Sequence, residues 1–159
     1  MPGVRWQTIK ISKDNGFKDF AVREGYHELD VEDCYHKRQI AKVVERTSYV
    51  FLVAKIARFE PKSLTLAFDD FDIFIKSDSL VTVEEHSGTR VERVCSRFPR
   101  ASDPPAVDVN HLVYALLDEI VDYYLVTLDN IGESIHVLED DVWKNPTPRT
   151  LEKIFKIKS

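Results

Sequence analysis

The sequence predicts an α/β (α+β) fold, in which a mixed or antiparallel sheet flanked by helices is followed by a long helix and the start of another. Two observations support this prediction. Short apolar segments alternate with turn signals through the first two thirds of the chain, which is typical of strands in a meander. Apolar residues then recur at alternating intervals of four and three positions over residues 117–142, which is typical of one long helix.

The expected strands lie between turn signals. Residues 6–12 alternate weakly and predict a strand at an edge of the sheet. The most apolar segment, residues 48–59, predicts a buried strand. Three further strands are expected at residues 64–68, 71–75 and 80–84. Asp69 and Asp70 interrupt the pattern and separate the first two of these three strands.

Two short helices are expected in the same part of the chain. Residues 17–24 have a helical apolar pattern that ends at Gly25, a residue suited to a helix C-cap. Residues 91–98 place their apolar side chains on one helical face and predict a second short helix. The polar run that follows Asp33 and ends at Thr47 is compatible with either a helix or a loop.

A long, acidic helix is predicted over residues 109–143, with Asp108 as its N-cap. We expect it to be unbroken even at Gly132, its weakest point in helix propensity. Its expected packed face consists of Leu117, Val121, Leu128, Ile131 and Ile135. At about 1.5 Å per residue, such a helix is roughly 50 Å long.

The clearest boundary is the proline-rich stretch at residues 99–105, because a double proline does not fit inside a helix. It divides the chain into an α/β domain at 1–106 and a helical region at 107–159. After the long helix, Thr147 and Pro148 predict the cap and first position of a new helix. The apolar stripe of this helix is unfinished at Ser159, so we expect the natural protein to continue.

Composition argues against several classes of protein. The net charge of −5 argues against nucleic-acid binding, which needs clustered lysine and arginine. Cys34 and Cys95 are isolated and are interpreted as reduced thiols of a cytosolic protein. There is no glycine-rich phosphate loop and no recognisable nucleophile context, so nothing indicates an enzyme. No stretch approaches 18 uncharged apolar residues, so no membrane span is expected within these residues.

Four stretches together resemble one family. They are GYHELDVEDC at 25–34, SYVFLVAK at 48–55, FDIFIKSDSLVTVEEH at 71–86 and the acidic helix at 110–142. Their order and spacing resemble the cytosolic part of CorA-type magnesium and cobalt transporters. The chain departs from the family pattern at Ala41, where the family usually has proline, and at Val44, where it usually has glutamate.

The resemblance implies a set of metal ligands. It places Glu32, Asp33 and Asp118 against a neighbouring subunit, where they hold regulatory divalent ions: Mg²⁺, with Co²⁺ or Zn²⁺ as alternatives. Carboxylate oxygens suit Mg²⁺, which keeps most of its waters and needs only one or two acids from each surface. Without the resemblance, Glu32 and Asp33 would be interpreted as a helix cap or a solvated turn. Asp129, Glu133, His136 and Asp140 share a helical face, which we interpret as solvated.

The resemblance also implies a function. The chain is expected to be the cation-sensing regulatory region of a homopentameric Mg²⁺/Co²⁺ channel. It would lie on the cytoplasmic side of the inner membrane and be joined to transmembrane helices that this sequence lacks. Two alternatives stay open: the soluble domain of a related zinc transporter, and a self-contained α/β and coiled-coil interaction module. Two runs of about 20 apolar residues downstream of Ser159 would favour a transporter.

Overall fold

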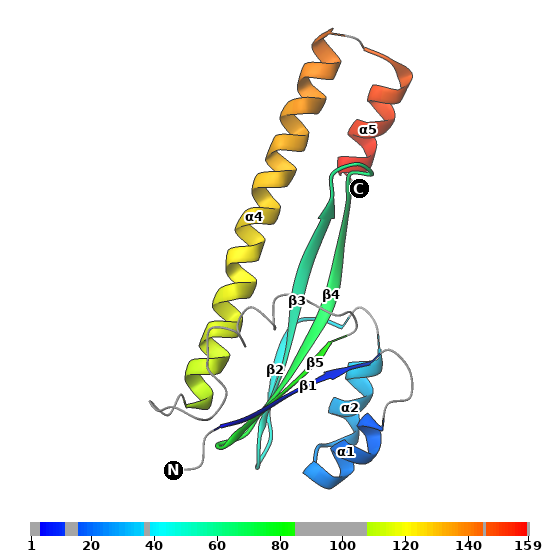
Figure 1. The fold of residues 1–159 in the computed structure, drawn as a ribbon. Coiled ribbons are helices and arrows are strands. Elements are labelled where there is room, and N and C mark those ends of the chain that lie inside the picture. Colours follow the sequence, from blue (N-terminus) through cyan, green and yellow to red (C-terminus); the bar gives the residue numbers. More distant parts are fainter. Residues whose placement is uncertain (1–3, 12–15, 37–38, 85–107, 145, 159) are drawn as a thin grey trace. The chain divides into compact units, whose positions relative to one another are not determined.

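The computed structural model describes residues 4–11, 16–36, 39–84, 108–144 and 146–158, and Figure 1 shows its elements. The chain divides into two compact units. Unit 1 comprises Met1–Ile56 and Asp69–Ile120, and unit 2 comprises Ala57–Phe68 and Val121–Ser159. The predicted helix at 91–98 and the predicted domain boundary after residue 106 lie outside the described residues, and the boundary stays a prediction.

A mixed five-stranded sheet with the order β1-β5-β4-β3-β2 confirms the predicted fold class. The strands are β1 (Arg5–Lys10), β2 (Lys42–Glu45), β3 (Val50–Glu60), β4 (Thr65–Ile75) and β5 (Ser79–Glu84). The β1 strand pairs in parallel with β5, whereas the β2–β3 and β4–β5 pairs are antiparallel. As expected, the first strand lies at an edge of the sheet.

The prediction of two separate strands at 64–68 and 71–75 is wrong, because β4 runs without a break from Thr65 to Ile75. The Asp70 carboxylate is compensated within the strand pair. It accepts hydrogen bonds from the ammonium group of Lys55 on β3 and from the backbone amide of Gln39, the latter at 3.2 Å. The polar run ending at Thr47, expected to be a helix or a loop, instead contains strand β2.

Helices α1 (Phe17–Glu24) and α2 (Glu28–Tyr35) lie on one face of the sheet (Figure 1). They enclose an aromatic core in which Phe74 contacts Phe17, Tyr26, Tyr49 and Phe51. Gly25 is the C-cap of α1 at φ 72°, a left-handed conformation that glycine adopts without strain. The prediction of a short helix ending at Gly25 is therefore confirmed.

Helix α4 (Val109–Lys144) is continuous through Gly132, as predicted. The Asp108 carboxylate accepts the backbone N–H of His111 at 2.7 Å and caps the helix. The predicted packed face, however, is wrong: Val121, Leu128 and Ile135 are 57%, 60% and 38% exposed. The row that is buried within unit 1 consists of Val109, Leu112, Leu116 and Ile120. A heptad pattern selects the stripe suited to pairing with another helix, and this buried row lies on a different face.

Unit 2 combines the turn between β3 and β4 with the rest of α4 and helix α5 (Pro148–Lys158). The predicted start of α5 is confirmed, because the Thr147 hydroxyl accepts the backbone N–H of Thr150 at 3.2 Å. An ion pair of 3.0 Å joins Lys153 on α5 to Asp141 on α4. Among the described residues, no helix is both long enough and apolar enough to cross a membrane.

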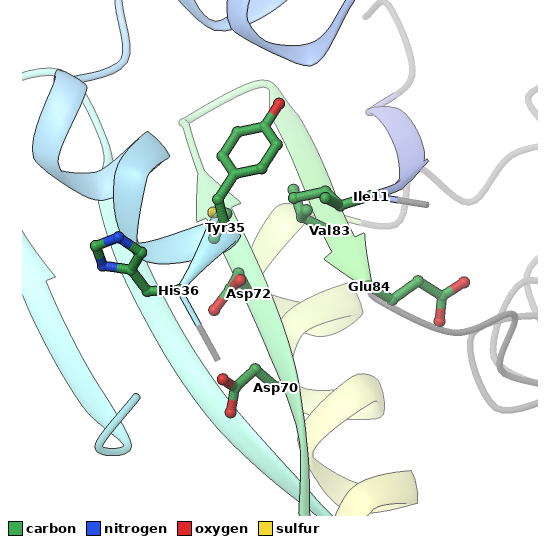
Figure 2. A pocket seen from close by; sticks show the side chains of 8 residues that line it. Ile11, Tyr35, His36, Asp70, Asp72, Val83 and Glu84 are labelled. Atoms are coloured by element: carbon green, nitrogen blue, oxygen red, sulfur yellow. The ribbon is translucent and has the colours of Figure 1, made fainter. Parts of the chain in front are cut away.

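A cavity of about 70 Å³ remains in unit 1 beside α2 (Figure 2). Cys34 and Tyr35 of α2 line it together with Asp70 and Asp72 of β4 and Val83 of β5. Asp70 and Asp72 are two positions apart, so their side chains emerge on the same face of the sheet. Glu84 of β5 also lines the cavity, so three carboxylates and a thiol border one small space.

Candidate functional site

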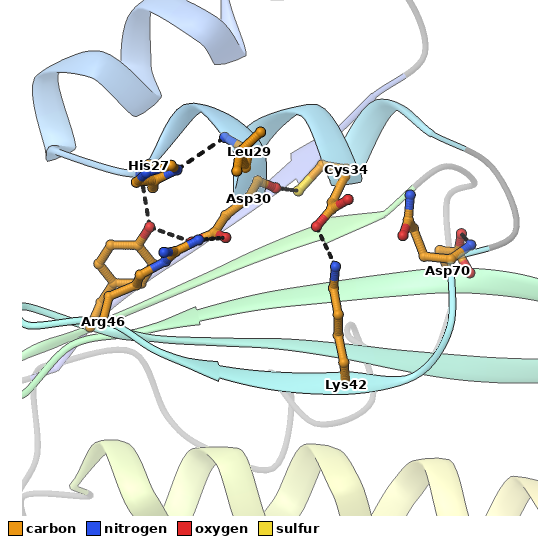
Figure 3. A network of polar contacts seen from close by, with 10 residues as sticks. His27, Leu29, Asp30, Cys34, Lys42, Arg46 and Asp70 are labelled. Atoms are coloured by element: carbon orange, nitrogen blue, oxygen red, sulfur yellow. Dashed lines mark hydrogen bonds and ion pairs between the residues drawn. The ribbon is translucent and has the colours of Figure 1, made fainter.

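Helix α2 carries two of the three expected metal ligands, and a buried carboxylate anchors it to the sheet. Asp30 is 1% exposed. Its two oxygens accept hydrogen bonds from Arg46 at 2.9 and 2.6 Å, and the Tyr49 hydroxyl donates a further one at 2.6 Å (Figure 3). The Tyr49 hydroxyl also accepts the backbone N–H of His27 at 2.8 Å, immediately before the helix. The start of α2 is therefore held by three connected side chains.

The electrostatics of Asp30 favour its charged form. Burial raises the pKa of the carboxyl, but the hydrogen bonds from Arg46 and Tyr49 outweigh burial and hold the pKa below its usual range. Asp30 thus carries a charge that is paired inside the protein. This arrangement fixes the orientation of the helix that presents the next acidic residues.

Asp33 lies one turn further along α2 and also has an internal cation. The Nζ atom of Lys42 on β2 is 2.5 Å from Oδ2 of Asp33 (Figure 3). The two side chains are 35% and 20% exposed, respectively. Asp33 is therefore neither a helix cap nor a solvated turn residue, because it lies inside a helix and in an ion pair.

The other two expected ligands are exposed. Glu32 lies on α2 with 57% of its side chain accessible, and its Oε1 atom is 3.7 Å from Nε2 of His36. Asp118 is exposed on α4. In the part of the chain that the structure describes, no three metal-ligating side chains form a metal-binding group. The metal-binding role of Glu32, Asp33 and Asp118 therefore stays a prediction.

The acidic face of α4 that the sequence singled out is exposed to solvent. Asp129, Glu133, His136 and Asp140 are all exposed. The His136 ring lies 3.2 Å from Glu139, and Asp140 pairs with Lys144 at 2.5 Å, both within the helix. Local pairs between exposed side chains contribute little to stability, because solvent screens them. The face behaves as the solvated surface that we expected.

Sequence reasoning missed the cavity side chains. Asp70 was interpreted, with Asp69, as an interruption between strands, and Asp72 was placed in the predicted strand 71–75 without a role; both belong to β4. Cys34 has a free thiol, as expected, but it also faces this cavity; Cys95 lies outside the described residues. The available signal was two acids at alternating positions of an apolar strand, which place two carboxylates on one sheet face.

The comparison with known families covers almost the whole chain. The family model described as "CorA-like Mg2+ transporter protein" matches residues 2–159. The cobalt/magnesium transport protein CorA of Thermotoga maritima is 27% identical over 143 residues, which are 84% of this chain and 38% of that protein. The chain thus spans well under half the length of this relative.

Two solved structures share the fold. The soluble domain of CorA from Methanocaldococcus jannaschii matches with a TM-score of 0.75 at 20% identity, covering 92% of this chain and 58% of that one. The cytoplasmic domain of ZntB from Vibrio parahaemolyticus matches with a TM-score of 0.69 at 10% identity, covering 96% and 62%. At these identities the likeness concerns the fold alone. Because the family model covers nearly every residue, the chain belongs to the family of CorA-like Mg²⁺ transporter proteins.

Proposed function

We propose that this chain is the regulatory, cation-sensing region of a CorA-type transporter of Mg²⁺ and Co²⁺. The observation that carries the proposal is the placement of Asp33 and Glu32 on a helix that Asp30 anchors to the sheet. Rigid placement matters because a cation between two surfaces must meet its ligands at set distances. Family membership and the name of the Thermotoga maritima relative support the choice of ions.

The donors suit a hard cation. Glu32, Asp33 and Asp118 offer only carboxylate oxygens, which Mg²⁺ binds while it keeps several of its waters. Mg²⁺ therefore needs only one or two acids from each side of an interface. The same oxygen-only donor set argues against the zinc transporter, since zinc prefers sites with imidazole or thiolate ligands. The proposed regulatory site thus favours Mg²⁺ over Zn²⁺, and the choice of Co²⁺ rests on the name of the Thermotoga maritima relative.

The proposed mechanism is a population shift in a homopentamer on the cytoplasmic side of the inner membrane. Acidic residues that meet across subunit interfaces repel one another, and bound cations neutralise them and favour the closed, symmetric assembly. When the cation concentration falls, repulsion loosens the interfaces and the pore opens. The pore itself belongs to transmembrane helices of the intact transporter.

Lys42 adds a refinement to this mechanism. Its ammonium group already neutralises part of the Asp33 charge, so an incoming ion has to compete with it. An ion pair that retains partial exposure is worth about 1 kcal/mol or less. Lys42 therefore raises the cation concentration at which the site fills, without preventing binding. In this role it sets the threshold of the sensor.

The proposal is tested with the intact transporter reconstituted in lipid vesicles. We expect uptake of Mg²⁺ and Co²⁺ that falls as Mg²⁺ rises on the side facing this region, together with Mg²⁺ protection of the region against limited proteolysis. Uptake that ignores Mg²⁺ on that side would contradict the sensing role. A complete protein that lacks two downstream runs of about 20 apolar residues would instead support the self-contained interaction module.

A further inference from the structure

The cavity beside α2 contains an unsatisfied carboxylate. Asp72 is 3% exposed, and its Oδ1 atom has no hydrogen-bond partner among the described residues. A buried carboxylate oxygen without a partner is costly, so native proteins usually satisfy such an atom with a proton, a water molecule or a cation. Asp72 borders a space of about 70 Å³ in which any of these would fit.

Cys34 provides a second donor in the same cavity. Its thiol lines the same cavity as Asp72 and donates a hydrogen bond to the backbone carbonyl of Asp30 at 3.2 Å. In Figure 2 the Asp72 carboxylate lies beside α2, whereas the Glu84 carboxylate points away from it. The two donors therefore come from α2 and β4 and meet across the cavity.

The local charge is acidic. Asp70 lies beside Asp72 on the same strand face, and Asp33 also contributes negative potential there. The lysines of this region pair with those neighbouring acids, Lys55 with Asp70 and Lys42 with Asp33. Because these neighbouring acids are paired, the attraction on a divalent cation in the cavity comes mainly from Asp72 itself.

We propose that Cys34 Sγ and Asp72 Oδ1 bind one borderline divalent cation, Zn²⁺ or Co²⁺, in this cavity. Sulfur and carboxylate donors together suit such ions, whereas Mg²⁺ avoids sulfur. No three ligating side chains are grouped among the described residues, so the site has two protein ligands and water completes the coordination. On binding, the thiol proton and any proton on the Asp72 carboxyl are released to solvent, and metal–sulfur and metal–oxygen bonds replace two metal–water bonds without any redox change.

This inference goes beyond the proposed function and does not depend on it. The proposed regulatory ligands are oxygens only and favour Mg²⁺. The cavity site contains a sulfur donor and favours Zn²⁺ or Co²⁺. The two sites can therefore be distinguished by the sulfur-to-cobalt absorption, which oxygen ligands do not produce. If the test of Mg²⁺ regulation fails, the proposal for the cavity site still stands. If the cavity site binds no metal, the proposed Mg²⁺ regulation still stands.

The test titrates the 159-residue chain with Co²⁺ and records the near-ultraviolet sulfur-to-cobalt charge-transfer absorption. Because the chain contains two cysteines, Cys95→Ser is used as the background. We expect one equivalent of Co²⁺ to produce the band and Zn²⁺ to remove it by competition. Cys34→Ser should abolish the band, and Asp72→Asn should weaken Co²⁺ binding by about tenfold or more.

Two controls keep the outcomes decisive. Asp19→Ala, which removes an exposed carboxylate from α1, should retain the band. If Asp72→Asn does not fold, a second measurement uses the chain with Asp72 intact. Bound Zn²⁺ should then slow the alkylation of the Cys34 thiol, as measured by mass spectrometry. No band in the Cys95→Ser background, a band that survives Cys34→Ser, or alkylation unaffected by Zn²⁺ would each overturn the proposal and leave the cavity to water or a proton.

Discussion

The ammonium group of Lys42 lies 2.5 Å from the carboxylate of Asp33, so the expected metal ligand has a competitor within its own chain. In the intact transporter, we expect Lys42→Met to lower the Mg²⁺ concentration that gives half-maximal protection against proteolysis. The Mg²⁺ binding free energy should improve by about 1 kcal/mol, which lowers the midpoint about fivefold, because Mg²⁺ no longer has to displace the lysine.

The matched control for this variant is Lys62→Met, an exposed lysine in the turn between β3 and β4. It removes the same charge from unit 2 and should leave the Mg²⁺ midpoint unchanged. If Lys42→Met also leaves the midpoint unchanged, Lys42 does not set the threshold.

The Asp30 network predicts a stability effect. Asp30→Ala leaves Arg46 and Tyr49 without their shared partner. We expect a loss of about 2–3 kcal/mol in the free energy of unfolding, below the range for a fully buried pair because the Arg46 side chain is 30% exposed. Urea denaturation measures this loss. Asp19→Ala, at an exposed position of α1, should stay within about 0.5 kcal/mol of wild type.

The same network gives a pH dependence. The pKa of Asp30 is lower in the folded protein than its ordinary value, so its stabilisation is present above the unfolded pKa and is lost as the pH falls through the folded pKa. The stability difference between wild type and Asp30→Ala should therefore shrink in acid. A difference that stays constant down to strongly acidic pH would show that the Asp30 charge contributes nothing.

Asp72 predicts a pH dependence of the opposite sign. Burial raises the pKa of Asp72 to about 7, against an ordinary value of 3.8. The folded protein therefore binds more protons than the unfolded chain between these values, and its stability falls as the pH rises through this interval. In metal-free buffer, Asp72→Asn should gain on the order of 2–4 kcal/mol relative to wild type between about pH 4 and pH 8. Urea denaturation at both pH values measures the change, and an unchanged difference would contradict it.

Gly132 predicts a gain in stability. An added Cβ at this position of α4 meets nothing within 4 Å. Gly132→Ala should therefore raise the free energy of unfolding by up to about 1 kcal/mol through helix propensity. Gly25→Ala is the matched control and should destabilise, since Gly25 has φ 72°. Thermal unfolding distinguishes these outcomes, and a loss of stability in Gly132→Ala would refute the expectation of free space at that position.

Much of the fold was predictable because its signals are local. Asp108 and Thr147 mark helix starts, and Gly25 marks a helix end, through hydrogen bonds or a backbone conformation that involve only near neighbours. Strands appear as apolar segments between turns. By contrast, α2 has little amphipathic character, and one of its two buried residues is Asp30. Its helical state depends partly on Arg46, sixteen residues away.

The remaining errors have the same origin. The continuity of β4 depends on Lys55, which lies on a different strand and compensates Asp70. The buried face of α4 depends on what packs against it, and a periodic sequence does not select among several apolar rows. At the candidate site, the sequence and the family resemblance supplied Glu32 and Asp33, whereas the pairing of Asp33 with Lys42 required the position of β2. Ligands contributed by a neighbouring subunit do not appear in a single chain.

The most direct test of the sensing role is a Mg²⁺ titration of the intact transporter with Asp33→Ala, followed by limited proteolysis. The variant removes a ligand and leaves the Lys42 ammonium group without its Asp33 partner. The lost ligand and the unpaired positive charge both disfavour Mg²⁺ at this site. It also removes some interface repulsion, but at millimolar Mg²⁺ the closed state owes its advantage to bound ions. A tenfold weaker site loses at most about 1.4 kcal/mol of Mg²⁺ binding free energy. In a symmetric assembly the losses at the equivalent sites add.

We predict that Asp33→Ala keeps its fold and shifts the protection midpoint about tenfold toward higher Mg²⁺. Asp19→Ala, which removes an exposed carboxylate from α1, should follow the wild-type curve. If the Asp33→Ala curve overlays the wild type across the whole titration, Asp33 is only the ion-pair partner of Lys42 and takes no part in cation sensing.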